Sequence, residues 1–379
     1  MAKTELIGLS KEELQRALTD IGEKPFRAKQ LWQWLYYFGE TDFEKMSNLS
    51  KVLRAKLAEN FTITRPKVVT EQLSSDKTRK WLLEFADGQR VEMVYIPETD
   101  RGAVCISTQV GCAVGCRFCH TGSQKLTRNL TAGEIVSQFM VARDTYGEWP
   151  SPTNETRYLS NIVVMGMGEP LHNLENTIKA LNILTDGDGI AISRRRVTMS
   201  TSGIAPHIVR ALKETGVRLA ISLHAPNNAL RSQIMPINNR YPLEEVLAAC
   251  REYQGNDGSR YITFEYLLLD GVNDSLECAQ ELIALMKKYG LRASFNLIPF
   301  NPWPGCAFQP SSNNRVRVFA QTLEKAGFAA PIRVARGQDI LAACGQLKSK
   351  HESWKICSKK IQKSDAPKGA AFLLIIQRR

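Results

Sequence analysis

The stretch Val110-Gly-Cys-Ala-Val-Gly-Cys-Arg-Phe-Cys119 says more about this chain than any other part of its sequence. It holds three cysteines, Cys112, Cys116 and Cys119, in a C-x3-C-x2-C spacing, and two glycines, at 111 and 115. Three thiolates so close together can wrap one loop around a compact inorganic centre. A four-iron cluster normally takes four protein thiolates. With three, one iron keeps an open position, as catalytic metal sites do. The amine and carboxylate of an amino acid can fill that position.

A zinc site completed by His120 is the alternative interpretation of the same loop. Cys119 and His120 are adjacent in the sequence. Two adjacent residues would have difficulty in binding one tetrahedral ion together. The local sequence therefore favours an iron–sulfur cluster over zinc.

Length and composition indicate the class of protein. A chain of 379 residues suits one domain of about 200–250 residues with appendages. No apolar run approaches the roughly 20 residues of a membrane helix, and the first residues, MAKTELIGLSKEEL, lack the apolar stretch of a signal peptide. Nine cysteines, an odd count, fit a reducing compartment. We therefore expect a cytoplasmic monomer that does not enter a membrane.

The charge of the chain indicates a polyanionic partner. Lys and Arg number 50 against 38 acids, which gives a net charge of +12. Phosphate backbones are the usual partners of such a surface, although a merely basic enzyme is the alternative. The segment from Gln346 to Arg379 holds nine Lys or Arg and two acids, and Arg194-Arg195-Arg196 is a second basic focus.

Residues 1–62 are predicted to form a small helical domain that binds RNA. Ser10 and Glu13 match a capping box, which predicts a helix from Lys11 to about Leu18. Pro25 predicts the start of a second helix, and a third is expected from about Ser50. Aromatic residues between 32 and 37 can stack on RNA bases, although we expect at least two of them to pack in the core.

The rest of the chain predicts an α/β fold. Two strand-like runs, 80–85 and 90–95, flank Asp87-Gly88 and predict a β-hairpin extension within 63–98. Six further strands, with a seventh at 331–335, alternate with six helices and predict a partial (β/α)6 barrel over 99–345, followed by a basic tail over 346–379. The strands are expected at 103–107, 161–165, 196–200, 217–223, 262–269 and 293–298, and the helices near 131–145, 173–185, 205–214, 242–254, 276–289 and 313–326.

Polar motifs follow the predicted strands, where chemistry gathers in barrels of this kind. Gly168 and Glu169 end the second strand; the glycine lets a ligand approach the backbone, and the carboxylate can take an ammonium group. A plain turn is the alternative there. Ser200 ends the third strand, Ser222-Leu223-His224 the fourth, and Asn301 follows the sixth. Hydroxyls and an imidazole suit a ribose and a carboxylate, although a lone histidine is often a packed core residue.

The remaining cysteines divide into two groups. Cys105 lies on the first strand of the barrel, and Cys344 lies in a segment of small residues that can cross the barrel mouth. Cys250 and Cys278 are expected to be buried, as free cysteines usually are. Cys306 and Cys357 receive no assignment.

The chain resembles the RlmN/Cfr family of radical S-adenosylmethionine (SAM) RNA methyltransferases. The resemblance runs from about residue 22 to 347 and rests on EKPFRAKQLWQWLY, VEMVYIPE, STQVGCAVGCRFCHTG, MGMGEPLHN, RRRVTMSTSG, AISLHAPN, NLIPFNPWPG and RGQDILAACGQL. His120 departs from the small residue that usually follows the third cluster cysteine. The tail beyond 347 does not visibly match.

The resemblance implies a cofactor set and a role for each motif. One [4Fe-4S] cluster would be bound by Cys112, Cys116 and Cys119, with SAM as its further ligand. Cys344 would carry a methyl group, Cys105 would release the product through a transient disulfide, and Glu92 would accept a proton. Contacts to SAM would come from the strand ends: Gly168, Glu169, Ser200, Ser222, Leu223, His224 and Asn301.

The resemblance also implies the substrates. The family methylates C2 of adenosine in the peptidyl-transferase centre of 23S rRNA and in tRNA, 3′ to the anticodon, and uses two SAM per turnover. An electron donor such as a flavodoxin would be a further partner. Methylation at C8, as by Cfr, is the nearest rival, and the N-terminal module favours C2. An enzyme that makes glycyl radicals and a zinc-stabilised RNA-binding protein without catalysis are more distant rivals.

Overall fold

A computed structural model describes residues 3–99, 101–151, 157–255 and 260–348. Residues Met1–Ser349 group into one unit by their contacts. Most of the predicted basic tail over 346–379 lies outside the described residues.

The three helices predicted near the N-terminus are confirmed. Ser10 and Glu13 form the expected capping box at the start of α1. The second helix differs in kind, because it continues as a π-helical turn. Trp32 and Tyr36 are buried there, so at least two of the aromatic residues do pack in the core. The elements are β1 (Thr4–Glu5), α1 (Lys11–Asp20), α2 (Arg27–Trp32), the π-helix η1 (Gln33–Tyr37), α3 (Lys51–Asn60) and β2 (Phe61–Thr62), with β1 and β2 paired in parallel.

Nine strands form one sheet in the order β13-β12-β11-β10-β9-β6-β5-β4-β3. The six strands from β6 to β13 in this order run parallel, as predicted, and β5, β4 and β3 continue the sheet antiparallel. The predicted hairpin is confirmed, and β3 adds a third strand that was not expected. The bounds are β3 (Lys67–Leu73), β4 (Arg79–Glu84), β5 (Arg90–Pro97), β6 (Gly102–Cys105), β9 (Leu159–Val164), β10 (Val197–Thr201), β11 (Arg218–Ser222), β12 (Ile262–Leu268) and β13 (Ala293–Pro299).

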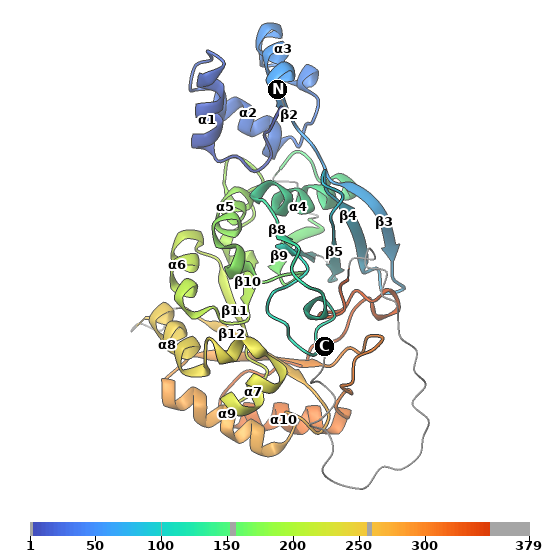
Figure 1. Cartoon of the computed structure of the whole chain (residues 1–379), viewed down its shortest axis with the longest axis vertical. Coiled ribbons are helices and arrows are strands. Elements are labelled where there is room, and N and C mark those ends of the chain that lie inside the picture. Colours follow the sequence, from blue (N-terminus) through green and yellow to red (C-terminus); the bar gives the residue numbers. More distant parts are fainter. Residues whose placement is uncertain (1–2, 100, 152–156, 256–259, 349–379) are drawn as a thin grey trace. The chain divides into compact units, whose positions relative to one another are not determined.

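Helices alternate with the parallel strands along the chain (Figure 1). All six predicted helices are present, and a seventh, α7, was not predicted. The predicted strand at 331–335 was wrong, because only isolated bridges at Ala329 and Ile332 form beside β13. Pro331 has no N–H to donate to a ladder there. The helices are α4 (Ala132–Tyr146), α5 (Leu174–Thr185), α6 (Ala205–Thr215), α7 (Asn228–Ile234), α8 (Leu243–Gln254), α9 (Leu276–Tyr289) and α10 (Asn313–Lys325).

The parallel strands are buried on both faces, as expected where helices cover a sheet. Phe264 of β12 and Phe295 of β13, for example, are fully buried and stack with ring centroids 5.7 Å apart. Cys250 is fully buried as predicted. Cys278 is only partly buried, since it lies in the first turn of α9 at the rim of the core. No helix within the described part of the chain is long and apolar enough to span a membrane.

Candidate active site

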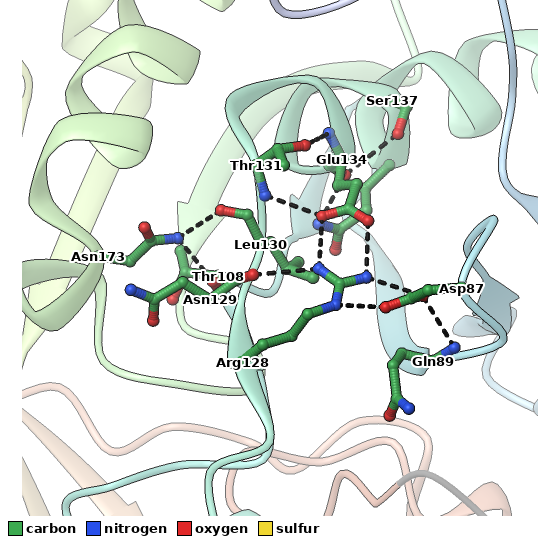
Figure 2. Close-up of polar contacts among 11 residues, drawn as sticks. Asp87, Gln89, Thr108, Arg128, Asn129, Leu130, Thr131, Glu134, Ser137 and Asn173 are labelled. Atoms are coloured by element: carbon green, nitrogen blue, oxygen red, sulfur yellow. Dashed lines mark hydrogen bonds and ion pairs between the residues drawn. The ribbon is translucent and has the colours of Figure 1, made fainter. Parts of the chain in front are cut away.

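The cysteine loop leaves the barrel between two short antiparallel strands, β7 (Gln109–Val110) and β8 (Arg128–Asn129). Arg128 of β8 connects this strand pair, the base of the cysteine loop, to two other elements (Figure 2). Its guanidinium donates to Asp87, in the turn between β4 and β5, at 2.6 and 2.9 Å, and to Glu134, in the first turn of α4, at 2.8 Å. The hydrogen bonds with Glu134 and Asp87 raise the pKa of Arg128. The base of the loop is therefore fixed by a permanent charge.

The turn after β9, which contains Gly168 and Glu169, is bound to the segment that leads into the cysteine loop. The Met167 N–H donates to Ser107 Oγ at 2.8 Å, and the Glu169 N–H donates to Gln109 Oε1 at 2.8 Å. Gly168 has a φ of 102°, and a Cβ there would lie 2.5 Å from the side chain of Gln109. The close approach of these two segments therefore requires a glycine.

Cys112, Cys116 and Cys119 line one cavity of about 140 Å³. The loop can fold tightly because Gly111 has a φ of 78°, and a Cβ there would meet the Lys125 carbonyl at 2.1 Å. Burial raises the pKa of Cys112 to about 12 and that of Cys116 well above its usual value. A bound cluster carries the positive charge that turns such thiols into thiolates. Three thiols in one cavity therefore fit an iron–sulfur cluster.

His120, the residue of the zinc alternative, makes other contacts. Its ring stacks on Trp303 with centroids 4.5 Å apart, and its Nδ1 lies 3.2 Å from the carbonyl oxygen of Gln346. Within the described ranges, no group of three or more His, Cys, Asp or Glu side chains, the three loop cysteines included, is arranged to hold a metal ion, so this finding does not separate zinc from a cluster. The observed contacts of His120 do not favour the zinc alternative.

Glu169 lines the same cavity and is buried. Its carboxylate accepts hydrogen bonds from the Leu171 N–H at 3.0 Å and from the Thr201 hydroxyl at 2.7 Å. The N–H and the hydroxyl of Ser202 also donate to it, each at 2.7 Å. A carboxylate with this many donors is held in one orientation. Glu169 therefore presents a fixed negative charge beside the cysteine loop.

Other strand ends supply the remaining wall of the cavity. Gly168, Ser200, Ser222 and His224 all line it, as does Cys344. The sequence placed each of these residues at a strand terminus or at the barrel mouth. Four parts of the chain that lie far apart in the sequence therefore bring polar groups and a thiol to one space.

His224 lies in the left-handed region, with a φ of 57°. Its Nδ1 accepts a hydrogen bond from the Leu267 N–H at 3.0 Å. Burial, and then the charge of Arg231, lower the pKa of His224 to about 3. The imidazole is therefore neutral, and because Nδ1 is an acceptor, the proton is assigned to Nε2.

Four of the predicted site residues do not line the cavity. Leu223 is fully buried, and its carbonyl accepts from Arg231. Asn301 accepts a hydrogen bond from Gln338 at 3.1 Å. Cys105 is buried at the end of β6, where burial raises its pKa to about 12. Glu92 is buried on β5 and forms an ion pair with Lys80 at 3.0 Å.

Two charged residues of the site were missed by the sequence analysis. Glu265 of β12 lines the cavity; burial raises its pKa, and Asn296 donates to it at 2.8 Å. Arg231 of α7 is fully buried and donates to Asn238 Oδ1 and to the carbonyls of Ser202, Ser222 and Leu223. A strand was predicted at 262–269, but nothing local showed that its glutamate faces a ligand cavity.

Cys344 lies in an irregular segment after the last short helix. The residue is exposed, yet the atoms packed around its thiol raise its pKa. The nearby groups of Cys105, Glu265 and Cys119 also raise the pKa of Cys344, because negative charge on them disfavours the thiolate. Cys344 therefore lies in the cavity that the cysteine loop lines and near Cys105 at the end of β6.

Comparison with known proteins agrees with this arrangement. Residues 4–63 match the model of the ribosomal RNA large subunit methyltransferase N-terminal domain, and residues 106–285 match that of the radical SAM superfamily. A solved radical SAM methyltransferase from Sphaerobacter thermophilus is 46% identical, with a TM-score of 0.84 over 91% of this chain and 99% of that one. Fold and site thus define a radical SAM methyltransferase, a class that uses SAM and a [4Fe-4S] cluster.

Curated relatives define the family within this class. A dual-specificity RNA methyltransferase RlmN of Rhodospirillum rubrum is 61% identical over 348 residues, which cover 92% of this chain and 81% of the relative. Its counterpart in Gluconobacter oxydans is 60% identical and covers 92% and 86% of the two chains. The chain belongs to the RlmN family.

Proposed function

We propose that this protein methylates C2 of adenosine in 23S rRNA and in tRNA through an S-methylcysteine at Cys344. The observation that carries the proposal is that Cys344 lines the same cavity as Cys112, Cys116 and Cys119. Adenine C2 is an electrophilic carbon, so it cannot attack the methyl group of SAM as an ordinary nucleophile would. A second carrier of the methyl group is therefore needed, and a thiol beside the cluster site supplies it.

The three cysteines would hold the [4Fe-4S] cluster, with SAM at the open iron. When bound, the cluster supplies the electron that cleaves SAM to methionine and a 5′-deoxyadenosyl radical. Glu169, fixed by four donors, would take the ammonium of SAM. Ser200, Ser222, His224 and the backbone at Gly168 would contact its other polar groups, with Leu223 and Asn301 acting from behind the cavity wall.

Cys344 would act twice. It first takes the methyl group of one SAM: its sulfur forms the new C–S bond with loss of the thiol proton, and the sulfonium C–S electron pair stays with S-adenosylhomocysteine. It then gives a hydrogen atom from this S-methyl group to the radical from a second SAM. The resulting carbon radical adds to C2 of adenine. Its position at the cavity wall supports both steps.

Glu92 and Cys105 would complete the reaction. Glu92 would accept the C2 proton, and the oxidised cluster would take back the one surplus electron of the radical adduct. The Cys105 thiolate would then attack the Cys344 sulfur and break its bond to the transferred carbon. That carbon would take up a proton and remain on C2 as the methyl group. The two sulfurs are oxidised to a disulfide in this step. The proximity of Cys105 to Cys344 supports the assignment.

The RNA-binding surface is proposed to include residues 1–62. Lys24, Phe26 and Lys29 are exposed around the start of α2, with Phe26 56% exposed. We divide the remainder into the hairpin extension 63–98, the radical SAM core 99–345 and the basic tail 346–379. A flavodoxin-type electron donor, a cytoplasmic location and a monomeric state are part of the same proposal. The net charge of +12 supports an RNA partner.

The test is anaerobic incubation of the reconstituted protein with SAM, dithionite and 23S rRNA fragments or tRNA. Nucleoside mass spectrometry should find one added methyl group on adenosine, with the retention time of 2-methyladenosine. An 8-methyladenosine product would assign the protein to the rival C8 activity. Zinc in place of iron and sulfide, with no modified nucleoside, would favour a non-catalytic RNA-binding protein.

A further inference from the structure

The Cys344 segment, residues 337–348, is held from the side of the hairpin by two buried side chains. Lys80 of β4 donates to the carbonyl of Leu341 at 3.2 Å, three residues before Cys344. Glu92 of β5 accepts from the N–H of Lys348 at 2.7 Å, four residues after it. The two side chains form an ion pair with each other at 3.0 Å. One buried pair thus holds the segment on both sides of its cysteine.

The cysteine loop also holds this segment. The His120 N–H donates to the carbonyl of Gly345 at 2.7 Å, and the Thr121 hydroxyl donates to the carbonyl of Leu347 at 2.7 Å. These contacts fix the residues that follow Cys344 to the loop that carries the cluster ligands. They do not reach the part of the segment before Cys344, which Lys80 contacts.

The backbone at Leu341 shows why a contact is needed there. Leu341 has a φ of 52°, in the left-handed region, which is unfavourable for a residue with a branched side chain. Residues in such conformations persist only where neighbouring groups hold them. The ammonium of Lys80, which is 7% exposed, forms a charge-assisted hydrogen bond with the carbonyl of this residue.

We propose that Lys80 is a positioning residue for Cys344: through Leu341 and Glu92 it holds residues 341–348 so that the thiol faces the cavity and accepts the methyl group of SAM. The proposal rests on the methyl-carrier role of Cys344. It assigns Lys80 no contact with SAM or with RNA, since Lys80 does not line the cavity.

The test uses cluster-loaded protein without RNA, so that only the first half of the reaction is measured. Methyl-labelled SAM is added, and the label on the Cys344 peptide is followed by mass spectrometry. Lys80→Met should slow this methylation by about tenfold or more, as expected for the loss of a charge-assisted hydrogen bond. Lys80→Arg keeps the charge and should stay within about threefold of the native rate, because Arg offers more donors but a different geometry. Lys67→Met, at an exposed position of β3, is the matched control.

Cleavage of SAM to 5′-deoxyadenosine without RNA is the second readout. It should be the same in all three variants, because the cavity residues are unchanged. Native methylation in Lys80→Met would overturn the proposal, and so would an equal loss of methylation and SAM cleavage, which would indicate general damage to the fold. Native protein that cleaves SAM but never methylates Cys344 would contradict the methyl-carrier role itself.

Discussion

The two halves of the candidate active site are built in different ways. On the barrel side, Ser200 lies near the end of β10. Glu169 and His224 follow β9 and β11 and bond to residues at or just beyond the neighbouring strands. On the other side, Cys344 lies in a segment whose only helix is the three-residue turn Gln338–Ile340. Side chains as far as 265 residues away in the sequence fasten that segment, as Ser74 does to Asp339. A ligand-binding wall can therefore come from a regular fold, while the nucleophile depends on individual long-range contacts.

The largest expected effect tests the barrel side. Cys116→Ala should abolish both the iron content and SAM cleavage, because two remaining thiols cannot hold the cluster. Iron and sulfide analysis with assay of 5′-deoxyadenosine measures this. Cys278→Ala, on α9, is the control and should retain both. Native iron content in the Cys116 variant would remove Cys116 from the ligand set.

A second effect concerns the buried arginine behind the barrel end. Arg231→Met removes the Arg231 donor from the carbonyls of Ser202 and Ser222, while the Leu223 carbonyl keeps the Ala225 N–H; each buried unpaired group costs about 1–3 kcal/mol. We expect a loss of about 3–5 kcal/mol in the free energy of unfolding, measured with urea on cluster-free protein. Arg240→Met, at an exposed position, should change it by less than about 0.5 kcal/mol. Equal stabilities of the two variants would show that the strand ends do not depend on Arg231.

A third effect is a dependence of stability on pH. The pKa of His224 is about 3 in the folded protein, and an unfolded histidine has a pKa of about 6.5. The unfolded chain therefore binds more protons between these values, and stability falls as the pH drops below about 6.5. The contribution of His224 has a slope of up to about 1.4 kcal/mol per pH unit. His224→Asn, which tolerates the left-handed backbone, should flatten the profile between pH 7 and 5. An unchanged slope would show that His224 is not buried as a neutral group.

The smallest effect on global stability is expected in the Cys344 segment. Gln346 accepts from the Ala343 N–H at 3.1 Å and donates to the Pro302 carbonyl at 2.7 Å. Gln346→Leu removes both hydrogen bonds, worth about 1 kcal/mol each, but should loosen only this segment. Hydrogen exchange at residues 343–347 should become faster, with the unfolding midpoint nearly unchanged. A large drop in the midpoint would mean that the segment belongs to the cooperative core.

The same contrast separates what the sequence could predict from what it could not. The parallel strands and their helices lie within about two residues of their predicted bounds, because long buried runs, caps and turn residues mark them locally. The edge strand β3 was missed, since Lys67–Leu73 is mostly exposed and mixed in polarity. The π-helical turn in η1 and the short helix α7 depend on packing rather than on local pattern.

The position of the predicted residues at the cavity was correct for most residues at strand ends, and it was wrong where tertiary contacts decide. Gly168, Glu169, Ser200, Ser222 and His224 do line the cavity. Asn301 follows β13 as expected, but its side chain bonds to Gln338 instead. The ion pair of Glu92 with Lys80 has no local signature, and neither does the burial of Glu265 at the cavity. Such contacts join residues far apart in the sequence, so they can be identified only from the folded structure.

The order in which the two reactive cysteines act distinguishes the proposed mechanism from a merely structural role for both. Cys105→Ala and Cys344→Ala proteins would each be incubated anaerobically with SAM, dithionite and an rRNA fragment, and the products run on a denaturing gel. The mechanism predicts a covalent protein–RNA species in the Cys105 variant, which can attack C2 but cannot release the adduct. It predicts none in the Cys344 variant, which has no methyl group to activate. Normal turnover by the Cys105 variant, or identical behaviour of the two proteins, would contradict the methyl-cysteine mechanism.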